Sequence, residues 1–288
     1  MNRFLRDLTL FLVGLLACFA TMYAINTVTS ELNAPRVESE ILIVGNSHMQ
    51  QSLNPIYFES AENISQSAEP LYVSYWKLNE LLPRSSVSIV VLGFSYLSLS
   101  PLGNRKLTDE RWSSTLFNRV YTIAELESLH DIKVDRLGLY RAKFKNMCLY
   151  PKWSHSNYMG HYFNFEKSVL ADPDEDIARH FLRDGKNVDI SMVALAHLDS
   201  IVALAAREKI ELILVAAPVH DSYYERIPDH FIAGFEDTKR ELEARGVRIL
   251  DYSQLEVVDD EFLNVTHLNE KGATRFSKLI SERIATPE

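Results

Sequence analysis

Four short apolar runs, separated by stretches with helical periodicity, constrain the fold of this chain more than any other feature. The runs occupy residues 40–45, 87–93, 212–216 and 247–251. The first is continuously apolar from Ile41 to Val44 rather than alternating, which is typical of a strand covered on both faces in a parallel sheet. Because such strands alternate with helices, the sequence predicts a three-layer α/β/α sandwich with a mainly parallel sheet.

Helical periodicity predicts the layers that cover this sheet. Gly246 stands where a C-terminal cap is expected for the helix before it. Residues 100–188 break the alternation, so we expect them to form a helical and loop insertion over the core domain. This insertion, which includes an aromatic-rich stretch over 150–165, is either a packed helical cap or a substrate lid. Helices are predicted over residues 53–60, 71–82, 116–129, 134–147, 190–208, 231–245 and 269–284.

The N-terminal segment differs from the rest of the chain. Residues 8–25 are almost wholly apolar and carry no charge, which is close to the length of ~17–20 residues that a bilayer span needs. Arg3 and Arg6 precede this run, and basic residues on that side indicate a cytoplasmic N-terminus with an exported body. We therefore expect an uncleaved signal anchor over residues 1–27, followed by a polar linker over 28–38.

Three alternatives for this segment remain open. It could be a signal peptide cleaved near Ala20 or Ala24, or a buried core helix. A lipoprotein signal would use Cys18, but the apolar residues that follow that cysteine disfavour it. Residues 39–288 are expected to form one α/β domain that contains the insertion.

Composition excludes some functions. The 288 residues carry a net charge of −9, which argues against a nucleic-acid-binding protein, since that class shows a basic face. The two cysteines, Cys18 and Cys148, are not expected to pair, and no Cys/His spacing is typical of a metal site. No glycine-rich phosphate loop is visible, which disfavours a flavodoxin-like nucleotide binder. We expect neither a metal nor a cofactor.

Two segments more than two hundred residues apart carry the candidate chemistry. Residues 41–48 read as a strand that ends in a small-residue turn carrying Ser47, and residues 262–269 place His267 in a polar loop before the last helix. Ligands bind beyond the carboxyl ends of the strands in an open parallel sheet, so both residues can reach one edge. A serine becomes a nucleophile when a base lies within hydrogen-bond reach and a third group orients that base, here Asn264.

These motifs resemble those of the SGNH (GDSL-like) hydrolase superfamily, especially its membrane-anchored bacterial members linked to cell-envelope polysaccharide acylation. The resemblance covers residues 40–95 and 190–284. It implies that Ser47, in Gly-Asn-Ser, is the nucleophile and that His267 is the base. It also implies an oxyanion hole, to which Ser65, two residues after Asn63, and Ser95, two residues after a glycine, would contribute in place of the usual glycine and asparagine.

The third member of the triad departs from the family pattern. Asn264 stands where the family has aspartate, and an amide can accept a hydrogen bond from the imidazole but cannot stabilise the imidazolium with a full charge. Asp251, Asp259 or Asp260 could supply that charge instead. His48, beside the nucleophile, could touch the substrate or only pack at the turn.

The sequence therefore leads to two hypotheses from different classes. The first is an exported, membrane-anchored serine esterase or O-acyltransferase that acts on acyl esters, in particular acetyl esters, of a cell-surface polysaccharide. Its partners would be the acyl donor or polysaccharide, the bacterial inner membrane and a multispanning O-acyltransferase, with the catalytic domain facing the periplasm. The second is a catalytically impaired relative that binds glycan or a membrane acyltransferase.

Overall fold

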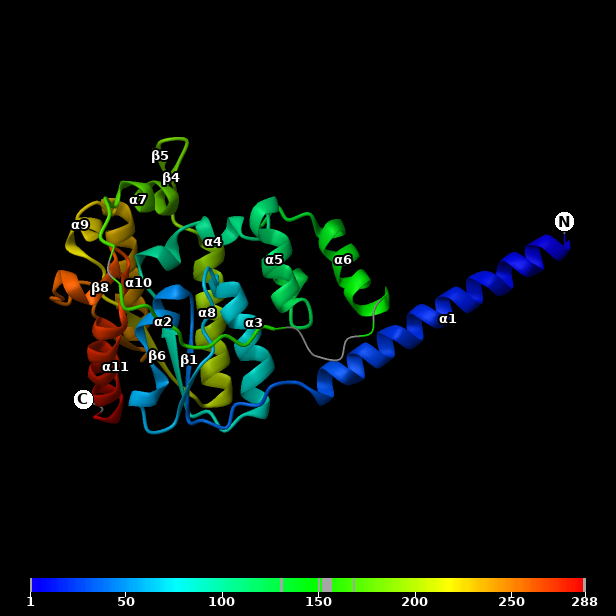
Figure 1. The fold of residues 1–288 in the computed structure, drawn as a ribbon, viewed down its shortest axis with the longest axis horizontal. Helices are drawn as coiled ribbons and strands as arrows, with labels where there is room; N and C mark the ends of the chain where they lie inside the picture. The colour runs from blue at the N-terminus through cyan, green and yellow to red at the C-terminus, as the bar shows by residue number, and fades with distance from the viewer. Residues whose placement is uncertain (1, 130–131, 150, 152–156, 168, 287–288) are drawn as a thin grey trace.

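A computed structural model describes residues 2–129, 132–149, 151, 157–167 and 169–286. Its central feature is a five-stranded sheet in the order β2-β1-β3-β6-β7, in which every neighbouring pair is parallel (Figure 1). The predicted parallel α/β sandwich is therefore confirmed. The strands are β1 (Ile41–Val44), β2 (Ala61–Asn63), β3 (Ile89–Gly93), β6 (Glu211–Ala216) and β7 (Arg248–Asp251).

Both faces of the sheet are covered, which explains the unbroken apolar runs. Along β1, Leu42 and Val44 pack into one apolar cluster, whereas Ile43 packs into a second cluster on the opposite face. Helices α3 and α8 contact each other on the first side, and α2 and α11 contact each other on the second. A strand with alternating polar residues would bury polar groups against one of these layers.

The helices surround the sheet in the order that the periodicity predicted, with shifted boundaries. The main ones are α2 (Ser47–Ser52), α3 (Leu71–Leu81), α8 (Met192–Glu208), α10 (Asp229–Ala244) and α11 (Glu270–Ala285). The insertion contributes α4 (Leu102–Arg105), α5 (Glu110–Val120), α6 (Arg136–Phe144), η5 (Lys145–Leu149), α7 (Asp174–Phe181) and the hairpin β4 (Leu182–Arg183)–β5 (Lys186–Asn187). Two short elements follow β6 and β7: α9 (Asp221–Tyr224) and the hairpin β8 (Phe262–Asn264)–β9 (His267–Leu268).

The predicted secondary structure differs from the structure at three places, for local reasons. The helix expected over 53–60 is only one turn of 3₁₀-helix, η1 (Pro55–Tyr57). The α-helix α2 lies before it, over Ser47–Ser52, where the Asn46 side chain caps it by accepting from the His48 N–H at 2.9 Å. The helix expected over 116–129 ends at Val120 and is followed by a turn of 3₁₀-helix over Leu126–Leu129. Strand β2 was not predicted, because its sequence, Ala-Glu-Asn, has no apolar run and lies at the edge of the sheet.

The N-terminal helix α1 (Asn2–Leu32) extends past the expected end at residue 27 into the segment expected to be a linker. Of the described residues, it is the one helix that is long and apolar enough to cross a membrane. It projects away from the body, and its C-terminal part approaches the insertion (Figure 1). Its apolar surface is exposed along most of its length, so it is no core helix of the domain.

Candidate active site

Ser47 lies at the first position of α2, directly beyond the carboxyl end of β1. Gly45 makes this turn possible: its φ is +151°, and a Cβ there would come within 3.3 Å of the Gly93 backbone nitrogen on the neighbouring strand. The first N–H groups of an α-helix have no partner within the helix, so the Ser47 amide is a candidate donor to an oxyanion.

His267 reaches Ser47 from the other end of the chain. It is the first residue of β9, which pairs with β8 in a short antiparallel hairpin. Strand β9 also packs against α2. The His267 Nε2 lies 2.8 Å from the Ser47 Oγ, within the distance that a nucleophile and its base require. The two segments singled out in the sequence therefore meet at one edge of the sheet.

Asn264 orients the base through its side-chain oxygen. The Asn264 Oδ1 lies 3.0 Å from the His267 Nδ1, and an amide oxygen can only accept, so Nδ1 carries the proton and Nε2 is left to accept from Ser47. Thr266, which sequence reasoning missed, donates its N–H and its hydroxyl to the same Asn264 oxygen at 3.0 and 3.1 Å. Its hydroxyl also lies 2.9 Å from the His267 Nδ1. The motif Asn-Val-Thr-His is thus one hydrogen-bonded unit.

The three aspartates considered as substitutes for the missing charge all pair elsewhere. Asp251 accepts from the Ser253 hydroxyl and pairs with Lys239. Asp259 lies 3.3 Å from the His220 ring, and Asp260 pairs with Lys271. The hypothesis that one of them supports His267 is therefore wrong, and the orienting group is neutral.

Burial keeps the histidines of the site neutral. Burial, with His48, His180 and Arg179 nearby, lowers the pKa of His267 well below its usual 6.5. His48 packs beside it with ring centroids 4.7 Å apart, and burial lowers the pKa of His48 to about 4. A neutral His267 is the form that can take a proton from a serine. His48 is 5% exposed and lines the cavity, and its buried Nδ1 has no hydrogen-bond partner among the described residues.

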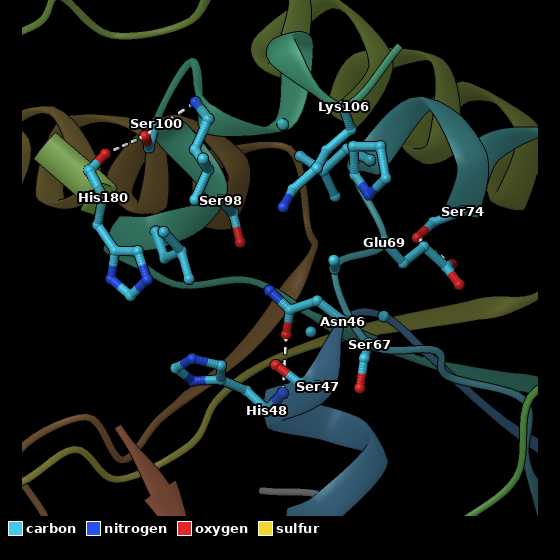
Figure 2. Close-up of a pocket in the computed structure, with 18 of the residues that line it drawn as sticks. Asn46, Ser47, His48, Ser67, Glu69, Ser74, Ser98, Ser100, Lys106 and His180 are labelled. Atoms are coloured by element: carbon cyan, nitrogen blue, oxygen red, sulfur yellow. Dashed lines mark hydrogen bonds between the residues drawn. The ribbon is translucent and has the colours of Figure 1, made fainter. Parts of the chain in front are cut away.

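A cavity of about 340 Å³ opens over this pair. Figure 2 shows Asn46, Ser47 and His48 on one side of it, with Lys106 and His180 across from them. The far wall comes from the insertion: the Lys106 amino group lies 4.0 Å from the ring centroid of Trp112, and Arg179 lines the same wall. Glu69 also lines the cavity, but its carboxylate is paired with the buried Lys77.

The residues expected to complete the oxyanion hole are not at the cavity. The Asn63 side chain donates to the Met49 and Leu53 carbonyls and accepts from the Ser65 N–H at 2.9 Å, so it locks the loop after β2 and uses up that amide. Ser95 caps the turn that follows β3 by a reciprocal pair of bonds with Ser98. The prediction that Ser65 and Ser95 donate to the oxyanion is therefore wrong. The Ser65 amide is bonded to Asn63 and its hydroxyl is buried away from the cavity, whereas the polar groups of Ser95 cap the turn with Ser98.

The aromatic stretch of the insertion does not act as a lid in its described part, residues 151 and 157–165. Its carbonyls accept from side chains of the core, including His161 from Gln50 and Met159 from Gln66, and Tyr158 is buried. None of these residues lines the cavity. Of the two alternatives for the insertion, the described aromatic residues form a packed cap, whereas Lys106, Trp112 and Arg179 of the same insertion line the cavity. Residues 150 and 152–156 lie outside the described residues.

Within the described chain, no cluster of three or more His, Cys, Asp or Glu side chains could hold a metal ion.

Comparisons with known proteins give only distant structural likeness. No family model and no curated protein matches the sequence. The chain is similar to a solved structure described as an acylhydrolase from Bacteroides fragilis (12% identity, TM-score 0.45, covering 89% of this chain and 93% of that one). It is also similar to a GDSL-like lipase from Bacteroides thetaiotaomicron (12% identity, TM-score 0.43, covering 93% and 98%). A third similar structure, described as a platelet activating factor from Streptococcus pneumonia, has 14% identity and a TM-score of 0.44, covering 96% and 97%.

Proposed function

We propose that this protein is a serine-dependent ester hydrolase or O-acyltransferase. The observation that carries the proposal is the contact of 2.8 Å between the Ser47 Oγ and the His267 Nε2, in a cavity, with the other ring nitrogen held by Asn264. A serine after a glycine turn is often only a helix cap. In this site the cap is Asn46, so the Ser47 hydroxyl is left to the histidine.

The geometry supports a two-step acyl transfer. In the first step the Ser47 Oγ attacks the ester carbonyl while His267 Nε2 takes the hydroxyl proton, and the oxyanion is held by donors that include the Ser47 amide. The C–O bond of the ester then breaks, and His267 returns the proton to the leaving alcohol. In the second step water or an acceptor hydroxyl gives its proton to His267 and attacks the acyl carbonyl. The bond between the acyl carbon and the Ser47 Oγ then breaks, and His267 returns the proton to Ser47, which regenerates the enzyme. Hydrolysis and transfer share the acyl-enzyme and differ only in this acceptor.

The resemblance of the motifs, with features of the cavity, supports an acylated saccharide as substrate. Trp112 is 42% exposed at the cavity wall and offers an aromatic surface for a sugar ring. In this proposal α1 anchors the enzyme in the bacterial inner membrane, and Arg3 and Arg6 before its apolar run favour a periplasmic body. A multispanning O-acyltransferase as partner, and an acetyl group as the acyl group, belong to the same proposal.

A serine-directed fluorophosphonate probe tests the nucleophile. We expect wild-type protein to be labelled and Ser47→Ala to be unlabelled. Ser67→Ala is the matched control, because the Ser67 hydroxyl also lines the cavity but donates to the Gln50 side chain, and it should keep its labelling. Labelling that survives Ser47→Ala would refute the assignment.

Asn264, in place of a carboxylate, is the specific observation that favours the binding-protein hypothesis. The same probe separates the two classes. If wild type is unlabelled under conditions that label an active serine esterase, the fold serves glycan or partner binding instead. Release of free acetate against acetylation of an added oligosaccharide then distinguishes hydrolysis from transfer.

A further inference from the structure

One surface segment has a composition unlike the rest of the chain. Between Arg136 and Leu149, which covers α6 and η5, there are four basic residues and no acidic one, in a chain whose net charge is −9. The same segment exposes large apolar side chains: Leu137 is 59% exposed, and Tyr140, Phe144 and Leu149 are each more than 40% exposed. The basic residues are Arg136, Arg141, Lys143 and Lys145.

The apolar and basic side chains share one side of the helix. Leu137 and Phe144 lie seven positions apart, about two helical turns, with Tyr140 between them, while Leu139 and Met147 point into the body and are buried. Arg141 and Lys145 stand next to the exposed apolar residues, and both are exposed. Long basic side chains can lay their stems along an apolar surface while their charges reach polar groups. The exposed apolar side chains are unfavourable in water. Together with the neighbouring basic side chains, they suit the boundary between lipid headgroups and acyl chains.

The segment lies against the N-terminal helix (Figure 1). The Phe144 and Phe19 rings meet edge to face with centroids 5.2 Å apart. The Asn26 side chain donates to the Met147 carbonyl at 2.8 Å, in a buried contact. Helix α6 is therefore held at a defined level along α1.

That level matches the depth of an interfacial helix. The apolar run of α1 ends at Ile25, and Phe19 lies six residues earlier, or about 9 Å at 1.5 Å per residue. Interfacial helices bury their apolar faces by about 5–10 Å at the boundary between headgroups and acyl chains. If α1 spans the bilayer, as proposed above, Phe144 enters the bilayer surface and the basic residues lie among the headgroups.

We propose that α6 and η5 form a membrane-docking surface that lies flat on the bilayer beside α1 and selects anionic lipid headgroups. The four positive charges outnumber the two nearby carboxylates, Asp135 at the N-cap of α6 and Glu127, which accepts from the Tyr140 hydroxyl. The net positive charge is the complement of an anionic surface. Because the same insertion carries Lys106 and Trp112 at the cavity, this second attachment restrains the cavity relative to the membrane, which a single helix followed by a short connection does not.

The test uses the full chain reconstituted into vesicles of phosphatidylcholine, with and without phosphatidylglycerol. In a Cys18→Ser/Cys148→Ser background, an environment-sensitive fluorophore is attached at Leu137→Cys. The matched control position is Val258→Cys, since Val258 is 55% exposed and lies shortly before β8, at the end of the body away from α1 (Figure 1). We expect quenching by lipids that carry a nitroxide near the headgroup at position 137 but not at position 258, and stronger quenching with phosphatidylglycerol.

Arg141→Gln/Lys145→Gln then tests the charges. Each basic residue near an anionic surface contributes about a fivefold factor to the docked population, so the pair should lower the docked-to-free ratio by roughly 25-fold. Lys186→Gln/Arg240→Gln removes the same charge from β5 and α10 and should have no effect. Helical circular dichroism and fluorophosphonate labelling should be unchanged in both pairs, which separates this proposal from the proposed function.

Three results would overturn the proposal. The first is equal quenching at positions 137 and 258. The second is quenching that does not respond to phosphatidylglycerol or to Arg141→Gln/Lys145→Gln. The third is protection of position 137 only when another membrane protein is added, which would make the surface a protein interface.

Discussion

Asn264→Asp tests the orienting group of the site most directly. In the wild type, the Asn264 side-chain oxygen is surrounded by three donors: the His267 Nδ1–H, the Thr266 N–H and the Thr266 hydroxyl, at 3.0 to 3.1 Å. All three suit a carboxylate oxygen equally well, so the substitution keeps the geometry. It adds one negative charge directly beside the imidazole.

The size of the effect follows from that geometry. Two unit charges ~4 Å apart attract by about 4 kcal/mol at an effective dielectric constant of 20. Moving the new carboxylate into a half-buried position offsets part of this gain. We therefore expect about half of the attraction to remain, which corresponds to roughly one to two pKa units at 1.36 kcal/mol per unit. Because the imidazolium forms in the transition state, kcat should rise by about tenfold to hundredfold at alkaline pH.

The assay is the pH dependence of ester hydrolysis by wild type and Asn264→Asp. Burial lowers the pKa of His267 in the wild type, so the wild-type acid limb should lie well below pH 6.5. A carboxylate favours the protonated ring and raises the pKa of His267, so His267 becomes a free base only at higher pH. The acid limb of the variant should therefore move to higher pH while its plateau rises.

Asn264→Leu is the matched control, because it removes the acceptor without adding a charge. We expect a lower plateau and no upward shift of the acid limb. If Asn264→Asp leaves both the plateau and the acid limb unchanged, then His267 is not the general base or Asn264 does not hold it in the active enzyme. That result would contradict the proposed roles of His267 and Asn264.

Three further predictions concern specificity, pH and packing. Lys106→Met should raise KM by about tenfold for an ester that carries a nearby negative charge and leave a neutral ester unaffected, as steady-state kinetics would show. Because burial lowers the pKa of His48 to about 4, the folded state binds fewer protons than the unfolded state below pH 6.5. This shift of the His48 pKa should by itself lower the free energy of unfolding by about 3 kcal/mol between pH 7 and pH 4, so denaturation of His48→Gln should show a flatter pH profile than wild type. Gly272→Ala places a Cβ 2.3 Å from the Glu261 carbonyl oxygen and should lower Tm and destabilise the β8–β9 hairpin; an unchanged Tm would refute that packing argument.

The strands show where sequence reasoning succeeds. A strand covered on both faces must be apolar at every position, so β1, β3 and β6 are visible as unbroken runs. In β2, Asn63 is buried and the other two residues are half-exposed, so the strand has no apolar run by which it could be predicted. Its pairing with β1 depends on the backbone, which any sequence can supply.

Some residues of the candidate active site could likewise be predicted from the sequence, and others could not. Ser47 and His267 were predicted because each must follow a strand or precede a helix at a characteristic place in the chain. Thr266 was missed, although it stands beside His267, because a threonine before a histidine has no signature until the loop folds. Lys106, Trp112 and Arg179 were missed because nothing in an irregular insertion ties a residue to a distant cavity.

The parallel sheet, the apolar N-terminal helix, and the two segments that carry Ser47 and His267 could all be predicted from residue order, since each depends on local periodicity or on strand order. Which polar groups remain available for chemistry became visible in the folded structure alone. Asn63, the Ser65 amide and Ser95 are hydrogen-bonded within nearby turns, while Asn264 and Thr266 are hydrogen-bonded to each other and to the base. Which partner each polar group bonds depends on distances in the folded chain, and residue order alone does not give those distances.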